Sequence, residues 1–436
     1  MNRRVLMITA AWPPVGRVGA RRPLRLARRL PALGWTPVVL TPTPECVFRR
    51  PPTMDPSLLE PPVEVYRVPA LIPSTRLDRL LGRLPDLMGR PFRLLLSDLL
   101  FPDQYPEWTR AAVRAAKTLD PVEAVWVTGG PWGIFVPGAA VARALGVPLI
   151  LDYRDPWTVD AKPRRTPIAV PRPALRWLES RVLKQAAGVA FVNDDILTRT
   201  RAAFGEYEAP WEVIPNGFDP QDVVDVAPIR PLRPTLLYAG SCYASRSMAP
   251  VLEAFASSMG PGETGAQLRV FGELDPAAQR VLAARPMPGR VDLEGRIPAA
   301  QLAGHLRGAD VLLLIIGDGH RTALSAKVFD YLQAGRPILG YGPEDCAAAQ
   351  LVRRCGVGVW THDHHTLVDA LTRLDARRIP YAPKPEEIAR YSADATAERT
   401  AGLLDAVVGA PRRSSADPTP RRQADSSGPA SSNASG

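Results

Sequence analysis

The sequence predicts an α/β protein of two domains, in which short buried strands alternate with amphipathic helices. The chain has 436 residues, more than one domain commonly holds, and its 46% hydrophobic and 22% charged residues are typical of globular proteins. Short apolar runs rich in β-branched residues recur, each bounded by glycine, proline or a small polar residue. Residues 219–234 are punctuated by proline and lack periodicity, which predicts a linker between two groups of such runs.

The first domain opens with a strand, a loop and a helix. Residues 5–9 are a buried strand, and a basic amphipathic helix over about residues 21–33 ends at Gly34 before a strand at 37–41. The loop lacks the G-x-G-x-x-G pattern, and no acidic residue closes the second strand, so a dinucleotide site is not expected. We expect further helices at 108–119, 133–145 and 175–185, and further strands at 124–127, 148–151, 189–192 and 212–214.

Two glycines in that first loop are candidates for close contact with a ligand. Gly16 and Gly19 carry no Cβ, so the backbone at these positions can approach a bound molecule. A plain flexible turn is the alternative interpretation of the loop.

A polar cluster follows the strand expected at 148–151. It reads Asp-Tyr-Arg-Asp-Pro-Trp, and loops at the carboxyl ends of parallel strands are where open α/β sheets bind ligands. Asp152, Arg154 and Asp155 are therefore candidates for a surface that binds a polar ligand such as a sugar. Asp155 is favoured, because Asp152 is a potential ion-pair partner of Arg154. A capped turn is the alternative.

The second domain is expected to repeat this alternation of strands and helices. Glycine turns follow two of its strands, at Gly272 and Gly295. We expect strands at 235–238, 268–271, 291–293, 311–316, 338–340 and 356–361, and helices at 248–257, 326–334 and 386–408. Residues 411–436 lack apolar residues other than alanine and are expected to be disordered.

The helix expected at 326–334 carries the most informative pattern in the chain. Ser325 is a candidate N-cap, and Gly335 followed by Pro337 ends the helix. Lys327 stands in the first turn, where the helix dipole disfavours a cation. The glycine loop before the helix, the free N–H groups of its first turn and this lysine together predict a phosphate site.

Asp330 follows Lys327 by one helical turn. Its carboxylate is placed either to hold Lys327 or to accept hydrogen bonds from a ribose hydroxyl. A solvated Lys–Asp pair without function is the alternative, because such pairs are common on helices.

A second loop of the same kind joins the strand at 235–238 to the helix at 248–257. It contains Gly240, Ser241 and Arg246, so small residues and a cation again precede a helix N-terminus. These three residues are candidates for binding the same anion. An exposed arginine near a helix cap is the alternative interpretation of Arg246.

Composition and spacing argue against several other kinds of site. The four cysteines have no C-x-x-C spacing, and the histidines at 362, 364 and 365 have no spaced partner, so neither a metal site nor a disulfide framework is expected. Residues 5–12 are too short for a signal peptide, and no apolar run reaches about 20 residues. We therefore expect a cytoplasmic protein. The basic clusters lack aromatic platforms, so nucleic acid is not an expected partner.

Residues 76–101 alternate arginine with leucine. Such a stretch can lie in the interface of an anionic membrane, which predicts peripheral association with its inner face. The net charge of +10 is compatible with this, although nearly all of it comes from arginine. Because Pro85, Gly89 and Pro91 interrupt any single helix, two short helices packed on the core are the alternative.

Several of these segments resemble family 4 retaining glycosyltransferases of the GT-B type. The segment SAKVFDYLQAGRPIL is similar to the family block "sgKlFEYLAAGrPil", and YRDPW, PNGFD and YAG resemble further blocks. The resemblance covers about residues 3–405 and implies two Rossmann-like domains facing each other across a cleft. It implies an acceptor-side domain at 1–218, a linker at 219–234, a donor domain at 235–385 and a helix at 386–410 that braces the first domain.

The same resemblance implies roles for individual residues. Gly240 would line the donor site, Arg246 would contact the diphosphate, and Asp330 would bind the ribose. The family has its first motif Glu where this chain has Thr322, a departure that concerns how the donor sugar is held. The catalytic candidates are Lys327, Arg246 and Asp155; the donor-binding candidates are Gly240, Ser241, Gly272, Gly295, Thr322, Ser325 and Asp330; the acceptor-side candidates are Gly16, Gly19, Asp152 and Arg154.

The activity implied is transfer of a sugar from a nucleotide-sugar donor to a glycan or lipid-linked acceptor, with retention, in cell-surface polysaccharide synthesis. Preorganised cations can stabilise the departing diphosphate, and the chain has no D-x-D triplet, so no metal or other cofactor is expected. A GT-B nucleotide-sugar epimerase is one alternative, although the side chains it needs at the sugar are hard to find. A non-catalytic nucleotide-sugar-binding protein is the other, favoured by Thr322.

Overall fold

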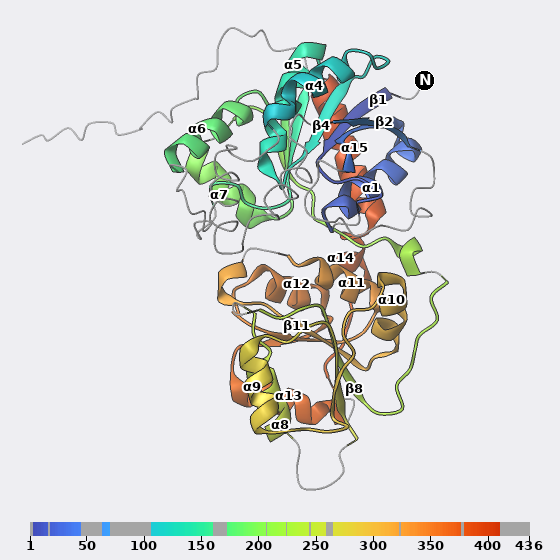
Figure 1. Ribbon diagram of the computed structural model, residues 1–436, viewed down its shortest axis with the longest axis vertical. Coiled ribbons are helices and arrows are strands. Elements are labelled where there is room, and N and C mark those ends of the chain that lie inside the picture. The colour runs from blue at the N-terminus through green and yellow to red at the C-terminus, as the bar shows by residue number, and fades with distance from the viewer. Residues whose placement is uncertain are drawn as a thin grey trace, which may run out of the picture.

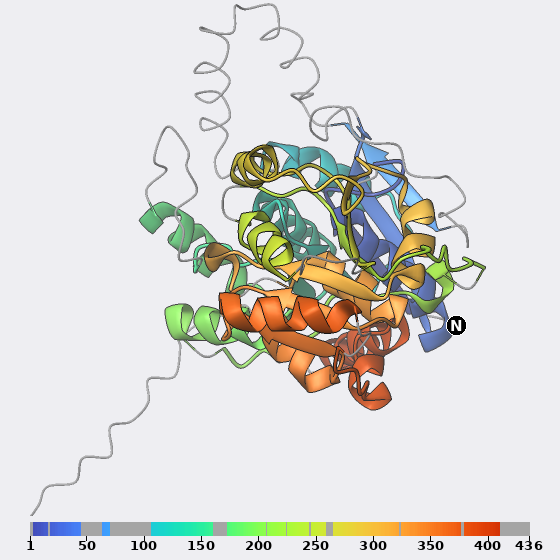
Figure 2. The same cartoon turned by 90° about the horizontal axis from the view of Figure 1, so that it is seen from below.

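The computed structural model describes residues 3–15, 18–44, 63–69, 106–159, 172–205, 207–223, 225–243, 246–258, 265–321, 324–375 and 379–409. They form two parallel sheets with helices packed around each, one domain above the other in Figure 1. Seen from below, the second domain lies in front of the first and overlaps it (Figure 2). The fold is therefore the predicted two-domain α/β fold. The predictions for Gly16, Thr322, residues 76–101 and the tail at 411–436 lie outside the described residues.

The first domain is built on a seven-stranded sheet in the order β3-β2-β1-β4-β5-β6-β7. Every neighbouring pair is parallel, and the strands beside β1 are buried on both faces, which explains their continuous apolar sequences. The strands are β1 (Arg3–Thr9), β2 (Trp35–Pro42), β3 (Glu64–Val68), β4 (Ala124–Thr128), β5 (Leu149–Tyr153), β6 (Gly188–Phe191) and β7 (Trp211–Val213).

Helices cover both faces of this sheet. They are α1 (Val18–Arg29), α4 (Thr109–Ala116), α5 (Phe135–Leu145), α6 (Arg172–Leu183) and α7 (Asp194–Phe204). A 3-10 helix at Leu30–Leu33 continues from α1. It ends at Gly34, whose φ of 83° favours glycine. The sequence did not predict α7, although Asn193 caps it by accepting a hydrogen bond from the backbone N–H of Ile196.

The second domain repeats the same strand order in a six-stranded sheet, β10-β9-β8-β11-β12-β13. Its strands are β8 (Thr235–Ala239), β9 (Gln267–Phe271), β10 (Val291–Leu293), β11 (Val311–Ile315), β12 (Ile338–Tyr341) and β13 (Gly358–Thr361). Its helices are α8 (Ala249–Ser257), α9 (Pro276–Ala284), α10 (Ala299–Gly308), α11 (Ala326–Ala334), α12 (Ala347–Cys355) and α13 (His364–Asp375). The helix over 326–334 is confirmed at both ends.

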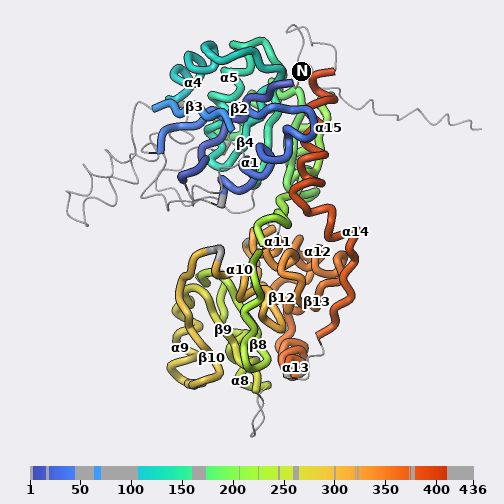
Figure 3. Tube along the Cα trace, turned by 90° about the vertical axis from the view of Figure 1, so that its right-hand side faces the viewer, coloured from blue at the N-terminus to red at the C-terminus, as the bar shows by residue number. Residues whose placement is uncertain are grey.

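The chain crosses between the domains twice, and the two crossings lie side by side (Figure 3). Phe218 donates its backbone N–H to the carbonyl of Tyr391 at 2.9 Å, and Ala393 donates to the carbonyl of Phe218 at 2.8 Å. The predicted single helix at 386–408 is wrong here, because this pairing interrupts it. The chain instead forms α14 (Pro385–Ala389) and α15 (Ala393–Gly409).

The last helix, α15, packs back onto the first domain. Leu403, Leu404 and Val407 are buried in the apolar cluster that lies under β1, β4 and α1. Asp405 accepts a hydrogen bond from the indole N–H of Trp35 at 2.9 Å. Both termini of the described chain therefore stabilise one domain.

Candidate functional site

A cavity of about 410 Å³ lies between the two domains, where the carboxyl ends of the first sheet face the start of α11. Parallel α/β sheets bind ligands at such ends, where the strand order reverses. Five predicted site residues line this interdomain cavity: Gly19, Arg154 and Asp155 from the first domain, and Ser325 and Asp330 from the second. The tertiary structure thus brings together residues that are more than 100 positions apart in the sequence.

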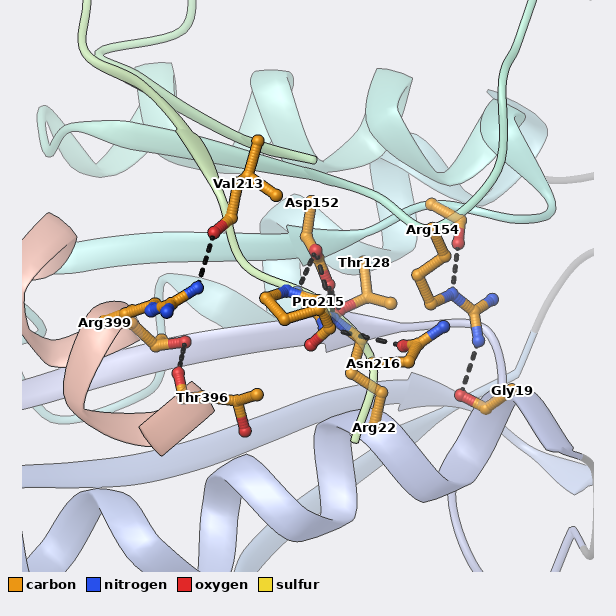
Figure 4. Close-up of polar contacts among 12 residues, drawn as sticks. Gly19, Arg22, Thr128, Asp152, Arg154, Val213, Pro215, Asn216, Thr396 and Arg399 are labelled. Atoms are coloured by element: carbon orange, nitrogen blue, oxygen red, sulfur yellow. Dashed lines mark hydrogen bonds and ion pairs between the residues drawn. The ribbon is translucent and has the colours of Figure 1, made fainter. Parts of the chain in front are cut away.

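Arg154 organises the first-domain wall of the cavity (Figure 4). Its guanidinium donates to the carbonyl of Gly129 at 2.6 Å, to that of Gly19 at 2.7 Å, and to that of Gly130. A Cβ on Gly19 would lie 2.6 Å from this guanidinium, so any larger residue there would have to displace the Arg154 side chain. Arg154 therefore ties the first turn of α1 to the loop that follows β4.

Asp152 does not pair with Arg154, and that prediction is wrong. Its carboxylate accepts from Arg22 at 2.9 to 3.2 Å and from the hydroxyl of Thr128 at 3.1 Å (Figure 4). Arg22 also donates to the carbonyl of Pro215 at 2.8 Å. Asp152 has no exposed surface, because α1 lies across the end of β5 and brings Arg22 onto it.

Asp155 is exposed at the rim of the interdomain cavity. Its backbone carbonyl accepts from the indole N–H of Trp132 at 3.3 Å, which positions the loop. Gly130 lies against its carboxylate, with a φ of 86°. Asp155 is therefore the predicted acceptor-side carboxylate that a molecule in the cavity can reach.

Lys327 lies in the first turn of α11, as predicted, and points to the carboxyl end of β8. Its ammonium donates to the hydroxyl of Tyr238 at 2.9 Å and lies 4.2 Å from the centre of that ring. Burial, together with the nearby positive charge of Arg246, lowers the pKa of Lys327 to about 8. Ser325 precedes α11 but makes no side-chain capping hydrogen bond.

Gly240 and Gly272 are required by the packing around Lys327. A Cβ on Gly240 would lie 2.5 Å from the ammonium, and the φ of 115° there also favours glycine. A Cβ on Gly272 would lie 2.4 Å from the carbonyl oxygen of Gly240. The two glycines thus allow β8, β9 and α11 to approach one another around the lysine.

The positive charge of Arg246 contributes to the lowered pKa of Lys327. Its guanidinium lies 5.2 Å from the centre of the Tyr243 ring, and its Nε is buried without a hydrogen-bond partner among the described residues. Neither cation belongs to the described wall of the interdomain cavity, so the two form a separate cationic cluster at the end of β8.

Ser241 and Gly295 lie near the edge of this domain's sheet. The hydroxyl of Ser241 accepts a hydrogen bond from Arg296 at 3.3 Å, and Arg296 also lies 3.3 Å from the carboxylate of Glu273. Gly295 has a φ of 71° in the turn after β10. The exposed side chain of Arg296 therefore links the turn after β10 to the loops that follow β8 and β9.

Asp330 does not hold Lys327. Its two carboxylate oxygens lie 3.3 and 3.4 Å from Nη1 of Arg21, which reaches across from α1 in the first domain. Burial raises the pKa of Asp330, although the positive charges of Arg21 and Arg25 oppose this shift. The ribose-binding candidate is thus paired with the opposite domain in this structure.

The arginines of α1 are the residues whose roles sequence reasoning missed. Arg25 pairs with Asp222 at 3.0 Å. Arg29 pairs with Asp219 at 2.5 Å and with Asp394 at 2.6 Å. Ion pairs therefore join α1 to both segments that cross between the domains. The basic face of this helix was the one feature of the sequence that could have indicated these roles. The sequence alone could not name the carboxylates that the face meets.

Two further findings concern only the part of the chain that the structure describes. Those residues contain no group of three or more His, Cys, Asp or Glu side chains able to hold a metal ion. Among the same residues, the helices are all too short or too polar to cross a membrane.

Residues 19–217 match the family model described as a glycosyl transferase 4-like domain. Among curated proteins, none matches the chain. Among solved structures, HepE from Anabaena, in complex with UDP and glucose, is 12% identical; the match covers 93% of this chain and 100% of HepE, with a TM-score of 0.60.

Two further solved structures have the same architecture. The lipopolysaccharide outer core galactosyltransferase WaaB is 13% identical, with 92% of this chain and 99% of WaaB covered and a TM-score of 0.59. The trehalose 6-phosphate synthase of Burkholderia multivorans is 15% identical, with 95% and 100% covered and a TM-score of 0.57. At these identities the likeness shows the fold.

Proposed function

We propose that the chain is a glycosyltransferase that takes its sugar from a nucleotide-diphosphate donor, on the basis of the glycosyl transferase 4-like match at residues 19–217 and of the fold it shares with HepE and WaaB. The observation that carries the proposal is the cationic cluster at the end of β8. Lys327, in the first turn of α11, donates a hydrogen bond to the neutral hydroxyl of Tyr238. The positive charge of a second cation, Arg246, contributes to the lowered pKa of Lys327. Such a cluster favours an anion, and a diphosphate suits its position at a helix N-terminus.

In this proposal the cations stabilise the charge that develops on the departing diphosphate. Lys327, Arg246 and the N–H groups of α11 are in place before the reaction, so they can stabilise that charge without reorganising. An acceptor hydroxyl attacks from the side on which the diphosphate leaves, which retains configuration, and the departing phosphate oxygen takes its proton. No protein carboxylate then acts as a nucleophile, and no step requires a metal.

The interdomain cavity is the proposed meeting place of donor and acceptor. Asp330, on the second-domain wall, would accept hydrogen bonds from the ribose of the donor. Asp155, exposed at the opposite rim, would accept a hydrogen bond from the hydroxyl of a glycan or lipid-linked acceptor. Arg154 would position the glycine loops between them. Synthesis of a cell-surface polysaccharide is the proposed context.

Peripheral association with an anionic membrane is part of this proposal, and α6 supports it. Trp177 is 58% exposed, with Arg181 stacked at 4.9 Å from its ring, and Lys184 continues the exposed stripe. Tryptophan and basic side chains together favour the interface of anionic lipids. Glu179, on the buried side of α6, accepts a hydrogen bond from the backbone N–H of Thr158 at 3.2 Å, which links the helix to the Asp155 loop.

One experiment separates the proposed transferase from its alternatives. The full chain is incubated with a panel of nucleotide sugars, and the products are resolved by mass spectrometry and by chromatography of the sugar. Transfer or slow hydrolysis of one donor supports the proposal, an epimerised donor would indicate the epimerase, and tight binding without turnover would indicate the non-catalytic protein. In the same preparation, flotation with phosphatidylglycerol vesicles but not with phosphatidylcholine vesicles is expected.

A further inference from the structure

Arg21 brings the acceptor-side helix α1 into contact with the proposed ribose-binding residue. Its Nη1 lies 3.3 and 3.4 Å from the two carboxylate oxygens of Asp330, and both side chains line the interdomain cavity. The side chain of Arg21 is 35% exposed, and that of Asp330 is 30% exposed. A molecule in the cavity can therefore reach both partners.

The neighbouring arginine on α1 shows what a fixed ion pair looks like in this protein. Arg22 meets Asp152 through several hydrogen bonds of 2.9 to 3.2 Å, with side chains only 6% and 0% exposed. The Arg21 pair is longer, uses a single nitrogen shared between two oxygens, and is open to the cavity. Its geometry is that of an ion pair that a ligand can displace.

A carboxylate can accept up to about four hydrogen bonds, so competition for Asp330 depends on position. Nη1 of Arg21 lies almost equally far from the two oxygens, at 3.3 and 3.4 Å, and therefore occupies the space in front of the carboxylate from which two neighbouring ribose hydroxyls would donate to it. We propose that Arg21 competes with the donor's ribose for Asp330, so that donor binding releases the Arg21 guanidinium into the interdomain cavity. This inference rests on the proposed function, and it adds a residue of the opposite domain that sets donor affinity.

The competition links the donor site to the acceptor side through α1. Arg21 lies two residues after Gly19 in the first turns of α1, and the carbonyl of Gly19 accepts a hydrogen bond from Arg154. Once Asp330 has exchanged its partner, a free guanidinium faces the cavity beside that contact. The donor-bound state then differs from the free state in both charge and contacts at the place where the acceptor enters.

The test compares binding of a ribonucleotide and of its analogue without ribose hydroxyls. UDP, GDP and ADP are titrated calorimetrically into the full chain, and the tightest of the three is used together with its 2′,3′-dideoxy form. Arg21→Ala is expected to tighten binding of the ribonucleotide by about twofold to fivefold, the range of a partly exposed ion pair. The dideoxy analogue does not need Asp330, so its affinity is expected to stay unchanged.

Two variants make the result specific. In an Asp330→Asn background, Arg21→Ala is expected to have no effect, because the competing ion pair is already gone. Arg28→Ala removes a cation from the same helix at a position outside the described cavity wall, and it should leave both affinities unchanged. Arg21→Gln replaces Arg21→Ala if the shorter side chain prevents folding.

Other outcomes would overturn the inference. Unchanged ribonucleotide affinity in Arg21→Ala would mean that no competition exists. Weaker binding of both ligands would mean that Arg21 contacts the nucleotide itself. If none of the three diphosphates bound the unmodified chain, the proposed function would fail, and the role of Arg21 with it.

Discussion

The two domains share a strand order, but the charged side chains at the ends of their strands have different partners. Where the order reverses in the first domain, Arg154 donates to three backbone carbonyls, and Asp152 is neutralised by Arg22. Where it reverses in the second, Lys327 has a tyrosine hydroxyl as its partner and a second cation beside it. The first site satisfies its charges internally and holds its loops in place. The second keeps its positive charge available for a ligand.

The difference shows how one fold can divide the work of a transfer reaction. A buried charge that is paired and hydrogen-bonded contributes to structure, and removing one partner is strongly destabilising. A cation that is partly desolvated without a carboxylate has a lowered pKa and gains most when an anion arrives. Under the proposed function, the first domain would hold the acceptor and the second would bind the diphosphate of the donor.

The largest expected effect is a loss of folding stability when the ion pair between Arg22 and Asp152 in the first domain is broken. Arg22→Ala leaves the carboxylate of Asp152 buried without its ion-pair partner, so we expect a loss of about 3–5 kcal/mol in the free energy of unfolding. Urea denaturation followed by circular dichroism measures it. The matched control is Arg21→Ala at the next position, whose exposed pair should contribute less than about 1 kcal/mol. Equal losses in the two variants would contradict the contrast between a fixed and an exchangeable arginine.

The next effect concerns the second site. Lys327→Ala is expected to weaken binding of a nucleoside diphosphate by about 1.5–3 kcal/mol, the range for a hydrogen bond to a charged group. Folding stability should not fall, because the substitution removes a desolvated cation. Calorimetric titration with UDP, GDP and ADP measures the affinity. Lys384→Ala, which removes an exposed lysine of the same domain, is the control and should bind normally.

The smallest effect is a dependence on pH. Because Lys327 titrates at about 8, its ammonium is lost as the pH rises through that value, and diphosphate affinity should fall by up to about tenfold per pH unit above it. Lys327→Arg keeps its charge, so its affinity should stay flat from pH 7 to about 9. A parallel decline in both proteins would show that another group titrates.

The lowered pKa of Lys327 also predicts whether folding stability rises or falls with pH. The folded-state pKa of Lys327 is about 8 and lies below the ordinary value of 10.5, so the unfolded chain binds this proton more tightly. The burial penalty on the ammonium is fully present below pH 8. It is relieved as the pH rises from 8 towards 10.5, so this group makes the folded state relatively more stable across that window.

Features that depend on a few neighbouring residues could be predicted from the sequence. The helix α11 begins and ends as predicted, because its N-terminal loop, Gly335 and Pro337 all act within a few residues of the ends. The position of Lys327 in its first turn follows from the same local signals. The break between α14 and α15 could not be predicted, because its cause is a pairing with Phe218 in a distant segment.

What the sequence determined by itself is the succession of strands, glycine loops and helices, with cations at particular helix starts. Only the tertiary structure decided which polar side chains meet: Arg22 with Asp152, Arg21 with Asp330, and Lys327 with Tyr238. The reason is physical. Caps, turns and apolar periodicity act over a few residues, whereas an ion pair between distant segments depends on strand order and on how one domain rests against the other.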